Sequence, residues 1–556
     1  MANEAVSPVA IEIPLRDIRQ RFFEVLPATL SWGTLIGLAA LSFVIPFWIA
    51  IFVIAYDLYA LIRAVYMTIH LVYAYRRLKF EKDVDWLARC RGVSGDLATY
   101  RDQVARQYDA ELENAEVTKR QRSMTRNHLR SLNAMLFAEQ EIPHWERVHH
   151  AIILPTYDES LTVLQTSLRS LVATDFPKER LHVVVGFEER VGQAAQDKAA
   201  ALTAEFGESF GSFVTTFHPD GLPGETRVKS ANASWAIQQL EKVLAEKGIP
   251  VADTLVSNFD SDTVVAPNYF SLLTYTYITE PDRYRASYQP LPMYNNNIWD
   301  APAFSRVIAT GSTFWQMIES TRPERLVTFS SHSMTLRALK DVGYWHKDKI
   351  SEDSRIFWQC LLHYDGNYRT IPLYTTVSMD AALAPTWWKT LINQYKQKRR
   401  WGWGIENFPY IAEGFLQNKW IAFSTKFHYL WRTLEGHWSW ATAPIIIAGL
   451  GWLPIFFGGP EFHATVLSYS LPFMARTIMT IAMAGLIIST ALTFLLLPRR
   501  PEYVKNWRYA TMALQWALVP LISTILSALP ALDAETRLAL GRDLQFNVMQ
   551  KTRKTA

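Results

Sequence analysis

The chain has few cysteines and little net charge, and each shortage excludes a class of protein. Cys90 and Cys360 are its only cysteines among 556 residues. Neither a disulfide framework nor a cysteine-based zinc site is therefore expected, and a reducing compartment fits this composition. The formal net charge is only +4, so the sequence offers no strongly basic surface and predicts no nucleic-acid partner.

Apolar residues are abundant, at 49% of the chain, but they are concentrated on either side of a polar block at 76–425. A helix needs about 20 mostly apolar residues to cross the hydrocarbon core of a membrane. The first two apolar runs roughly reach this length, and Pro46 between them predicts the break of a helical hairpin. The five predicted runs are Leu26–Val44, Phe47–Met67, Trp438–Phe457, Met474–Leu497 and Tyr509–Leu529.

Basic residues flank the first hairpin on the same side. Arg16, Arg19 and Arg21 precede it, and Arg76 and Lys79 follow it. This bias predicts that both ends of the hairpin, and the polar block after it, lie in the cytoplasm. We therefore expect an integral protein of the cell or inner membrane, in contact with lipids. No small-residue cleavage site follows the first run, which predicts a retained anchor.

Charged residues also affect how the second and the last apolar runs are interpreted. Asp57 and Arg63 lie within the second run and are expected to face protein or the membrane interface. Three C-terminal crossings would leave the tail outside, whereas its basic residues favour the inside. Either the last run is re-entrant around Pro520, or there is a further crossing.

Short apolar strands alternate with amphipathic helices after His150. AIILP, LHVVVGF and TLVSNFD read as buried strands, separated by segments with helical spacing. This alternation predicts an α/β domain with a mostly parallel sheet covered on both faces. Ligands bind such sheets at the carboxyl ends of the strands.

Acidic residues follow two of these strands. Asp158 and Glu159 come after the first, and Asp260 and Asp262 come after the third. Carboxylates one residue apart can turn toward one ion, and oxygen ligands suit Mg²⁺ or Mn²⁺ bridging a diphosphate. The pair could also be a turn of solvated acids, but its place after a buried strand favours the metal site.

Two more signals follow in the second half of the block. Glu352 and Asp353 precede an amphipathic run, so Asp353 is either a general base or a helix cap. Gln397, Arg400 and Trp401 belong to the segment QKRRW. Arginine suits phosphate oxygens, while the tryptophan offers a flat face for a sugar or anchors the chain at a membrane interface.

The order of these motifs resembles that of family 2 glycosyltransferases with the GT-A fold. The resemblance covers about 148–405 and is closest to the membrane-embedded processive branch of cellulose, hyaluronan and chitin synthases. It implies a cytoplasmic α/β GT-A domain, Rossmann-like and mostly parallel, inserted between transmembrane and interfacial helices. The expected parts are a transmembrane hairpin at 1–79, a helical arm at 80–147, the GT-A domain at 148–405, interfacial helices at 406–437, transmembrane helices at 438–530 and a basic tail at 531–556.

The resemblance also implies roles for individual residues. Asp353 would be the catalytic base, and Asp260 and Asp262 would bind the metal. Glu352, Gln397 and Trp401 would lie on the acceptor or product side. The residues expected to bind the donor are Thr156, Asp158, Glu159, Glu188, Lys229, Asp260 and Arg400, with Asn232 opening the helix after Lys229.

The chain departs from the family pattern at two segments. Gly186–Arg190 replaces a DDG-like turn, and Phe329–Ser333 replaces a glycine-rich segment on the acceptor side. His332 and His346 have no partner at a metal-ligand spacing, so both are read as structural.

The expected function is inverting, metal-dependent transfer of a hexose from a nucleotide-sugar, expected to be a UDP-sugar, to a growing polysaccharide at the membrane. Export of the product would accompany this reaction in a processive enzyme. One alternative is a single addition to a lipid-linked acceptor. Another is a non-catalytic membrane scaffold or export component.

Overall fold

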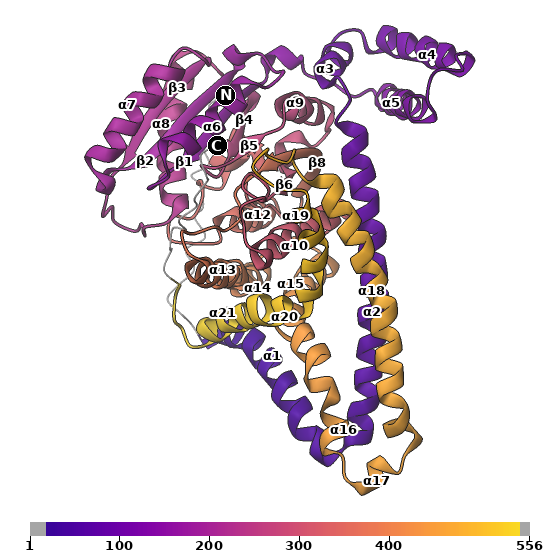
Figure 1. Ribbon diagram of the computed structural model, residues 1–556. Helices are drawn as coiled ribbons and strands as arrows, with labels where there is room; N and C mark the ends of the chain where they lie inside the picture. Colours follow the sequence, from indigo (N-terminus) through magenta and orange to yellow (C-terminus); the bar gives the residue numbers. More distant parts are fainter. Residues whose placement is uncertain (1–17, 545–556) are drawn as a thin grey trace.

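The polar block folds around an eight-stranded mixed sheet (Figure 1). In the computed structural model, which describes residues 18–544, the strand order is β3-β2-β1-β4-β7-β6-β8-β5. The strands are β1 (His149–Pro155), β2 (Leu181–Glu188), β3 (Ser212–His218), β4 (Thr254–Asn258), β5 (Val264–Val265), β6 (Ala286–Met293), β7 (Ser333–Thr335) and β8 (Arg369–Ser378).

One half of the sheet is parallel. β1 pairs in parallel with β2 and β4, so that His150 lies opposite both Leu181 and Leu255, and β2 pairs in parallel with β3. These strands are rich in Val, Ile and Leu, as expected where both faces are covered. In the other half, β7 is antiparallel to β4 and β6, while β8 is parallel to β6 and antiparallel to β5.

Helices cover both faces of the parallel half, because alternate residues of each strand point to opposite sides. Ile152 of β1 packs in one core cluster with α6 and α7, whereas Ile153 packs in another with α8 and α12. The predicted mostly parallel sheet with helices on both faces is confirmed. The helices around the sheet are α6 (Leu161–Val172), α7 (Gln193–Phe206), α8 (Lys229–Glu246), α9 (Tyr269–Thr279), α10 (Ala303–Ser320), α11 (Leu336–Asp341) and α12 (Glu352–His363).

The N-terminal hairpin consists of α1 (Ile18–Val44) and α2 (Pro46–Glu81), and Pro46 begins the second helix as predicted. α2 extends beyond the predicted end at Met67 as far as Glu81. Its last turns pack against the sheet domain, where the Arg77 guanidinium lies 4.0 Å from the ring centre of Tyr374 in β8. The hairpin therefore reaches from the apolar helices to the sheet.

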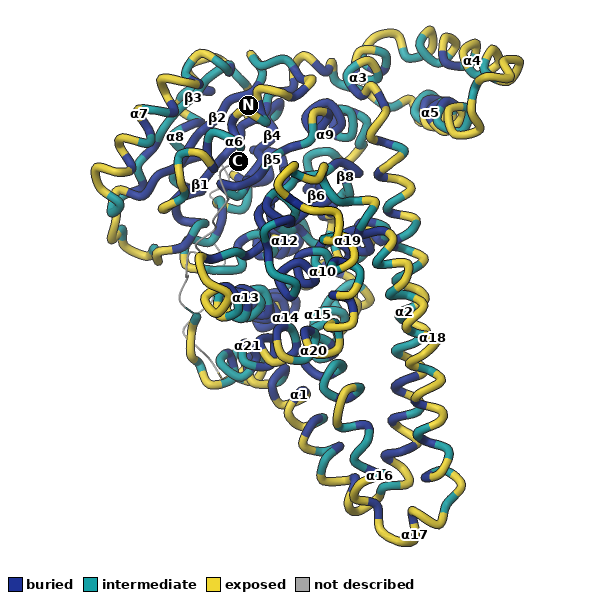
Figure 2. Tube along the Cα trace, in the orientation of Figure 1, coloured by how far each residue is buried: buried dark blue, intermediate teal, exposed yellow. Residues whose placement is uncertain are grey.

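The predicted arm is helical and comprises α3 (Trp86–Ser94), α4 (Leu97–Glu113) and α5 (Lys119–Phe137). Trp86 and Cys90 of α3 are buried against α9, in the core of the sheet domain. α4 and α5 form a hairpin that projects from the molecule and is largely exposed (Figures 1 and 2). Val104 of α4 and Leu132 of α5 are nevertheless buried in the same core cluster, and the His128 ring centre lies 6.3 Å from that of Tyr275 in α9. The arm therefore joins the core through α3 and through the inner side of this hairpin.

Helices dominate the chain after β8. They are α13 (Trp387–Gly402), α14 (Asn407–Gln417), α15 (Phe423–Ala448), α16 (Leu453–Phe457), α17 (Pro460–His463), α18 (Val466–Leu496), α19 (Trp507–Leu514), α20 (Val519–Ser523) and α21 (Leu529–Ala539). Short turns complete the chain: η1 (Trp145–Arg147), η2 (Lys178–Arg180), η3 (Glu189–Val191), η4 (Val251–Asp253), η5 (Arg283–Arg285), η6 (Trp403–Glu406), η7 (Leu450–Trp452), η8 (Gln515–Leu518) and the π-helical η9 (Thr524–Ala528).

Four helical segments of the described residues are long and apolar enough to cross a membrane: α1, α2, α18 and Trp507–Ala539. α15 and Leu450–Phe457 form a fifth if this pair, bent by 48°, is one span. The two charges in α2 face protein, as predicted. Asp57 is 7% exposed, and Arg63 Nη1 lies 2.9 Å from Glu435 Oε1 of α15.

The last apolar run changes direction between α19 and α21 (Figure 1). α21 packs against α13, and a Cβ at Gly402 would lie 3.1 Å from the Ala531 Cα. Arg399 Nη1 of α13 also lies 2.9 Å from Asp533 Oδ2 of α21. Arg16 and the basic residues beyond 544 lie outside the described residues, so the topology of the tail stays a prediction.

Candidate active site

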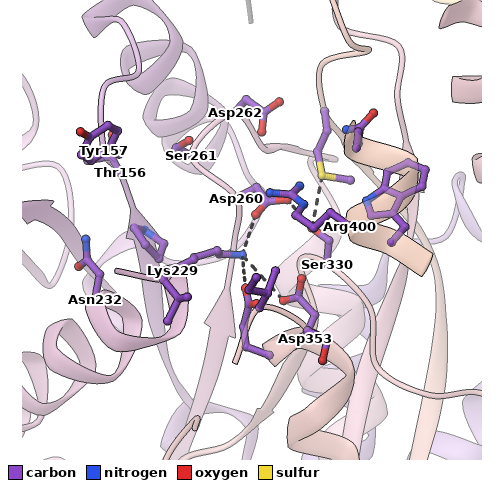
Figure 3. A pocket seen from close by; sticks show the side chains of 18 of the residues that line it. Thr156, Tyr157, Lys229, Asn232, Asp260, Ser261, Asp262, Ser330, Asp353 and Arg400 are labelled. Carbon is purple, nitrogen blue, oxygen red and sulfur yellow. Dashed lines mark hydrogen bonds and ion pairs between the residues drawn. The ribbon is translucent and has the colours of Figure 1, made fainter. Parts of the chain in front are cut away.

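A cavity of about 200 Å³ opens at the carboxyl ends of β1, β2 and β4 (Figure 3). Its walls come from these strand ends, from the first turns of α8 and α12, and from the last turns of α13. Residues far apart in the sequence therefore meet here. The predicted site residues that line it are Thr156, Glu159, Glu188, Lys229, Asn232, Asp260, Asp262, Glu352, Asp353, Gln397, Arg400 and Trp401.

Asp158 is the predicted site residue that the structure does not bring into this cavity. Its side chain is 74% exposed and its Oδ1 lies 3.7 Å from Lys198 Nζ. Glu159 turns inward instead: its Oε2 accepts hydrogen bonds from Thr156 Oγ1 at 2.7 Å and from the Tyr157 backbone N–H at 2.8 Å. Glu159 therefore braces the turn after β1, and a donor-binding role of Asp158 stays a prediction.

Lys229 lies at the centre of the cavity, in the first turn of α8. Its Nζ is 2.6 Å from Asp260 Oδ1, 3.7 Å from Glu352 Oε1 and 3.8 Å from Asp353 Oδ1. Burial alone would lower the pKa of Lys229, but these three carboxyl groups raise it above its usual range. One turn further along α8, Asn232 donates a hydrogen bond to a backbone carbonyl of β2 at 2.9 Å. The charged ammonium thus draws together acidic groups from two elements.

Glu352 and Asp353 form the first turn of α12, where the partial positive charge of a helix N-terminus favours carboxylates. Burial and the charge of Asp353 raise the pKa of Glu352. The Glu352 side chain is only 5% exposed, whereas that of Asp353 is 25% exposed. The N-cap position belongs to Ser351, so helix capping does not account for Asp353. Of the two acids, Asp353 is the one open to a substrate.

Asp260 and Asp262 follow β4 and both line the cavity. Asp260 Oδ2 accepts a hydrogen bond from Ser330 Oγ at 2.5 Å. Asp262 is 1% exposed, and its Oδ2 accepts the backbone N–H of Asp380 at 2.8 Å. Within residues 18–544, no three His, Cys, Asp or Glu side chains are grouped so that they could hold a metal on their own. A metal here would need oxygen ligands from a substrate as well.

One side of the cavity contains a series of charged contacts around Glu188 at the end of β2. Glu188 Oε2 lies 3.3 Å from Arg190 Nε and 3.5 Å from His218 Nδ1, and His218 Nε2 lies 2.7 Å from Glu225 Oε2. Burial alone would lower the pKa of His218, but the two glutamates outweigh it and raise the pKa. The Arg190 guanidinium also lies 4.7 Å from the ring centre of Tyr157.

The other end of the cavity is aromatic. The Trp401 ring centre lies 5.7 Å from that of Tyr294 and 6.3 Å from that of Phe329. The side chain of Gln397 is fixed by Gln394, whose Nε2 donates a hydrogen bond to Gln397 Oε1 at 3.0 Å. The side chain of Arg400 extends toward Asp260 (Figure 3). Flat apolar surfaces therefore stand opposite a charged end.

Several lining residues were not predicted from the sequence. Arg190 and Ser330 lie in the two segments where the chain departs from the family pattern. That departure was the only feature of the sequence that could have pointed to them. Arg227 lies two residues before Lys229 and forms an ion pair with Asp220 at 2.7 Å. Nothing in the local sequence distinguishes Tyr294, because its place in the cavity depends on pairing of β6 with distant strands.

Part of the chain matches a known protein family. Residues 255–529, just under half of the chain, match the family model described as glycosyl transferase family group 2. A search of curated protein sequences gave no match. The match begins at β4, so it covers the Asp260 pair, the Glu352–Asp353 pair and the Trp401 segment.

Several solved structures show a distant likeness. A mannosyltransferase from Pyrobaculum calidifontis in complex with GDP-Man and Mn²⁺ is 13% identical, with a TM-score of 0.37, covering 72% of this chain and 99% of that one. S. aureus TarS is 14% identical, with a TM-score of 0.32, covering 61% and 55%. TarS 1–349 from S. aureus in complex with UDP-GlcNAc is 14% identical, with a TM-score of 0.33, covering 65% and 95%. On its family match and its sheet, this chain is a glycosyltransferase similar to family group 2, with a catalytic domain of the GT-A type.

Proposed function

We propose that the chain transfers a hexosyl group from a nucleotide-sugar, with inversion, to a growing polysaccharide at the membrane. The observation that carries this proposal is the arrangement of one cavity. Lys229, Asp260 and Asp353 meet at one end, and Trp401 closes the other. A donor diphosphate suits the charged end, and a sugar ring suits the aromatic end.

Asp353 would act as the general base. An acceptor hydroxyl is a weak nucleophile, so a carboxylate within hydrogen-bond reach must take its proton as the hydroxyl oxygen attacks the anomeric carbon. The bond from that carbon to the diphosphate breaks on the opposite side, so one displacement inverts the configuration. Lys229 and Arg400 would stabilise the negative charge that develops on the leaving diphosphate.

The residues present fit a divalent metal that would be bound jointly by protein carboxylates and by the phosphates of the donor. Mg²⁺ is commonly held by one or two carboxylates together with substrate phosphates, and Asp260 and Asp262 supply two carboxylates. Four acids against one lysine and one arginine also leave this end of the cavity with an excess of acidic groups. Mg²⁺ or Mn²⁺ bound there would supply positive charge to the diphosphate.

A uracil base on the donor side is supported by the chemistry of Glu188. An ionised carboxylate only accepts hydrogen bonds, so it suits a base that presents a ring N–H. Uracil and guanine both present such a donor, whereas the ring nitrogens on the pairing edges of adenine and cytosine are acceptors. Arg190 Nε and His218 Nδ1 lie 3.3 Å and 3.5 Å from Glu188 Oε2. We propose a UDP-sugar as the donor, and the donor screen below distinguishes it from a GDP-sugar.

A second candidate function is the addition of one sugar to a lipid-linked acceptor. It is favoured by the small number of apolar segments, four or at most five within residues 18–544. Both candidates place the catalytic domain in the cytoplasm, against membrane lipids. A non-catalytic scaffold is less well supported, because the fold gathers acidic groups from β4 and α12 around one lysine.

The test is a donor screen on the purified full-length protein in detergent with Mg²⁺ or Mn²⁺. Release of nucleoside diphosphate would be followed, and the product would be sized. Release with one donor and a polydisperse polymer supports the first proposal. A single product formed only with added lipid acceptor supports the second. Equal activity of the Asp353→Asn variant would overturn the base, and no release with any nucleotide-sugar would overturn both candidates.

A further inference from the structure

Lys398 lies three residues before Trp401 in α13, so the two side chains share one face of the helix. The Lys398 ammonium nitrogen is 4.6 Å from the ring centre of Trp401 and 5.7 Å from that of Trp440 in α15. Both distances lie within the range of a cation–π attraction, for which tryptophan is the best ring. One ammonium therefore contacts two tryptophan rings that belong to different helices.

A third helix fixes the position of this ammonium. Lys398 Nζ donates a hydrogen bond to Ser312 Oγ of α10 at 3.3 Å. Trp440 is held in turn, because its indole N–H donates a hydrogen bond to Ser527 Oγ of η9 at 2.7 Å. The ammonium thus has a defined place between α10, α13 and α15.

Lys398 differs from the lysine inside the cavity in having no carboxylate to balance its charge. Burial lowers the pKa of Lys398 to about 7, and no acid within the described residues offsets this effect. By contrast, three carboxyl groups raise the pKa of Lys229 above its usual range. Lys398 should therefore change between its charged and neutral forms near neutral pH, whereas Lys229 stays charged.

The elements packed around this ammonium bring few groups that could change its charge. α10 and η9 present hydroxyls, and α15 presents His437, three residues before one of the two tryptophans. The acids of α21 and η6 have other partners. Asp533 is paired with Arg399, and Glu406 accepts the backbone N–H of Ser351 at 3.2 Å. Burial, and not a neighbouring acid, therefore decides the pH at which the ammonium loses its proton.

The contact concerns a ring that belongs to the cavity. Trp401 lines the cavity, whereas Lys398 does not, so the ammonium contacts the ring from outside the space that a substrate would occupy. The aromatic neighbours of Trp401 inside the cavity are more distant, at 5.7 Å and 6.3 Å between ring centres. A cation–π attraction requires a charged ammonium. The orientation of the Trp401 ring therefore depends on the charge of Lys398.

We infer that Lys398 is a positioning residue, whose charged ammonium holds the Trp401 ring in the orientation that stacks on an acceptor sugar. This inference rests on the proposed function, in which Trp401 binds the acceptor. Protonated Lys398 fixes the ring in advance of binding, and neutral Lys398 releases it. The affinity for the acceptor therefore falls as the pH rises past neutrality, although Lys398 itself touches neither substrate.

The experiment compares Lys398→Met with Lys398→Arg in the full-length protein in detergent. Methionine fills much of the same volume without a charge, whereas arginine stays charged at any accessible pH. The probe is an oligosaccharide of the sugar that the donor screen identifies. Its KM, and its Kd by calorimetry, are measured between about pH 6 and pH 9. We expect Lys398→Met to raise both about fivefold at pH 6, the loss of one cation–π contact, while KM for the donor stays within about twofold.

The pH profile separates a positioning role from a purely structural one. The parent should lose its advantage over Lys398→Met as the pH rises, because its own ammonium becomes neutral. Lys398→Arg should keep the lower KM and Kd at every pH. The matched control is Lys396→Met, which removes an exposed lysine of the same helix and should follow the parent.

Two results would overturn the inference while transfer, and with it the proposed function, remains intact. In one, Lys398→Met binds the oligosaccharide as tightly as the parent at pH 6. In the other, it binds more weakly by the same factor at pH 6 and pH 9, as a loss of packing requires. Thermal unfolding would identify a Lys398→Arg variant that fails to fold, and the comparison of Lys398→Met with the parent then decides. If the parent itself does not bind the oligosaccharide, the acceptor role of Trp401 falls, and the inference falls with it.

Discussion

The Nζ of Lys229 lies 2.6 Å from the Oδ1 of Asp260, so the first turn of α8 and the end of β4 are joined by one buried ion pair. Removing one member of a buried pair leaves an uncompensated charge. We expect Lys229→Met to lower the free energy of unfolding by about 2–3 kcal/mol, less than for a fully buried pair because Asp260 is partly exposed.

Thermal unfolding in detergent would measure this loss, with Lys340→Met as the control, since Lys340 forms a more exposed pair with Glu241. Lys229→Met should also abolish donor binding, because it removes the positive charge nearest the proposed diphosphate. If Lys229→Met were as stable as Lys340→Met, the expected loss would be contradicted. The Lys229 ammonium would then not be needed to offset the repulsion between the carboxylates of the cavity.

Trp401 should contribute to binding of the acceptor and not to binding of the donor. Its ring faces Tyr294 and Phe329 at the aromatic end of the cavity. We expect Trp401→Ala to raise KM for a soluble oligosaccharide acceptor about tenfold, the loss expected from removing one stacking surface. Trp401→Phe should keep most of the affinity. Isothermal titration of the donor would show unchanged binding; weaker donor binding in Trp401→Ala would contradict this assignment.

Stability should depend on pH through His218. Because Glu188 and Glu225 raise its pKa in the folded chain, the protonated ring stabilises the fold. This contribution is complete below about pH 6.5, the ordinary pKa of histidine. It is lost as the pH rises through the raised pKa. Melting temperatures measured between about pH 6 and pH 9 should therefore fall less steeply in His218→Gln than in the parent. The exposed His144 provides a matched control variant, His144→Gln, which should follow the parent; a parallel fall in all three proteins would exclude His218 as the cause.

Topology can be tested by labelling a cysteine added at the tip of the α4–α5 hairpin. Both native cysteines are buried, so they should react slowly with a membrane-impermeant maleimide. Ala115 lies in the exposed connection between α4 and α5. We expect Ala115→Cys to react in inverted inner-membrane vesicles but not in intact cells, because the sequence predicts a cytoplasmic domain. Labelling in intact cells would reverse the predicted orientation.

Local sequence patterns predicted much of the catalytic half. The buried runs AIILP, LHVVVGF and TLVSNFD form β1, β2 and β4, because continuous apolar strands suit a parallel sheet covered on both faces. Acidic residues after β4 and at the start of α12 meet in one cavity, since strand ends and helix starts lie at the same edge of the sheet.

Other features depend on pairings that local sequence does not show. The antiparallel insertion of β7 between β4 and β6 brings Ser330 to the cavity, and no nearby pattern indicates it. Asp158 lies at the right strand end, but the turn after β1 directs Glu159 inward instead. α15 also joins a predicted interfacial helix to a predicted apolar run, because Phe423–Ala448 continues without a break.

Gly402 lies where the helix that carries Trp401 meets the apolar C-terminal segment. It follows Trp401 on the same helical turn and lies against Ala531 of the apolar C-terminal segment. Asp260, by contrast, is carried by the sheet. In the proposed reaction, the distance between a donor at Asp260 and an acceptor at Trp401 therefore depends on how α13 packs against α21. A lipid that displaced α21 would change this distance.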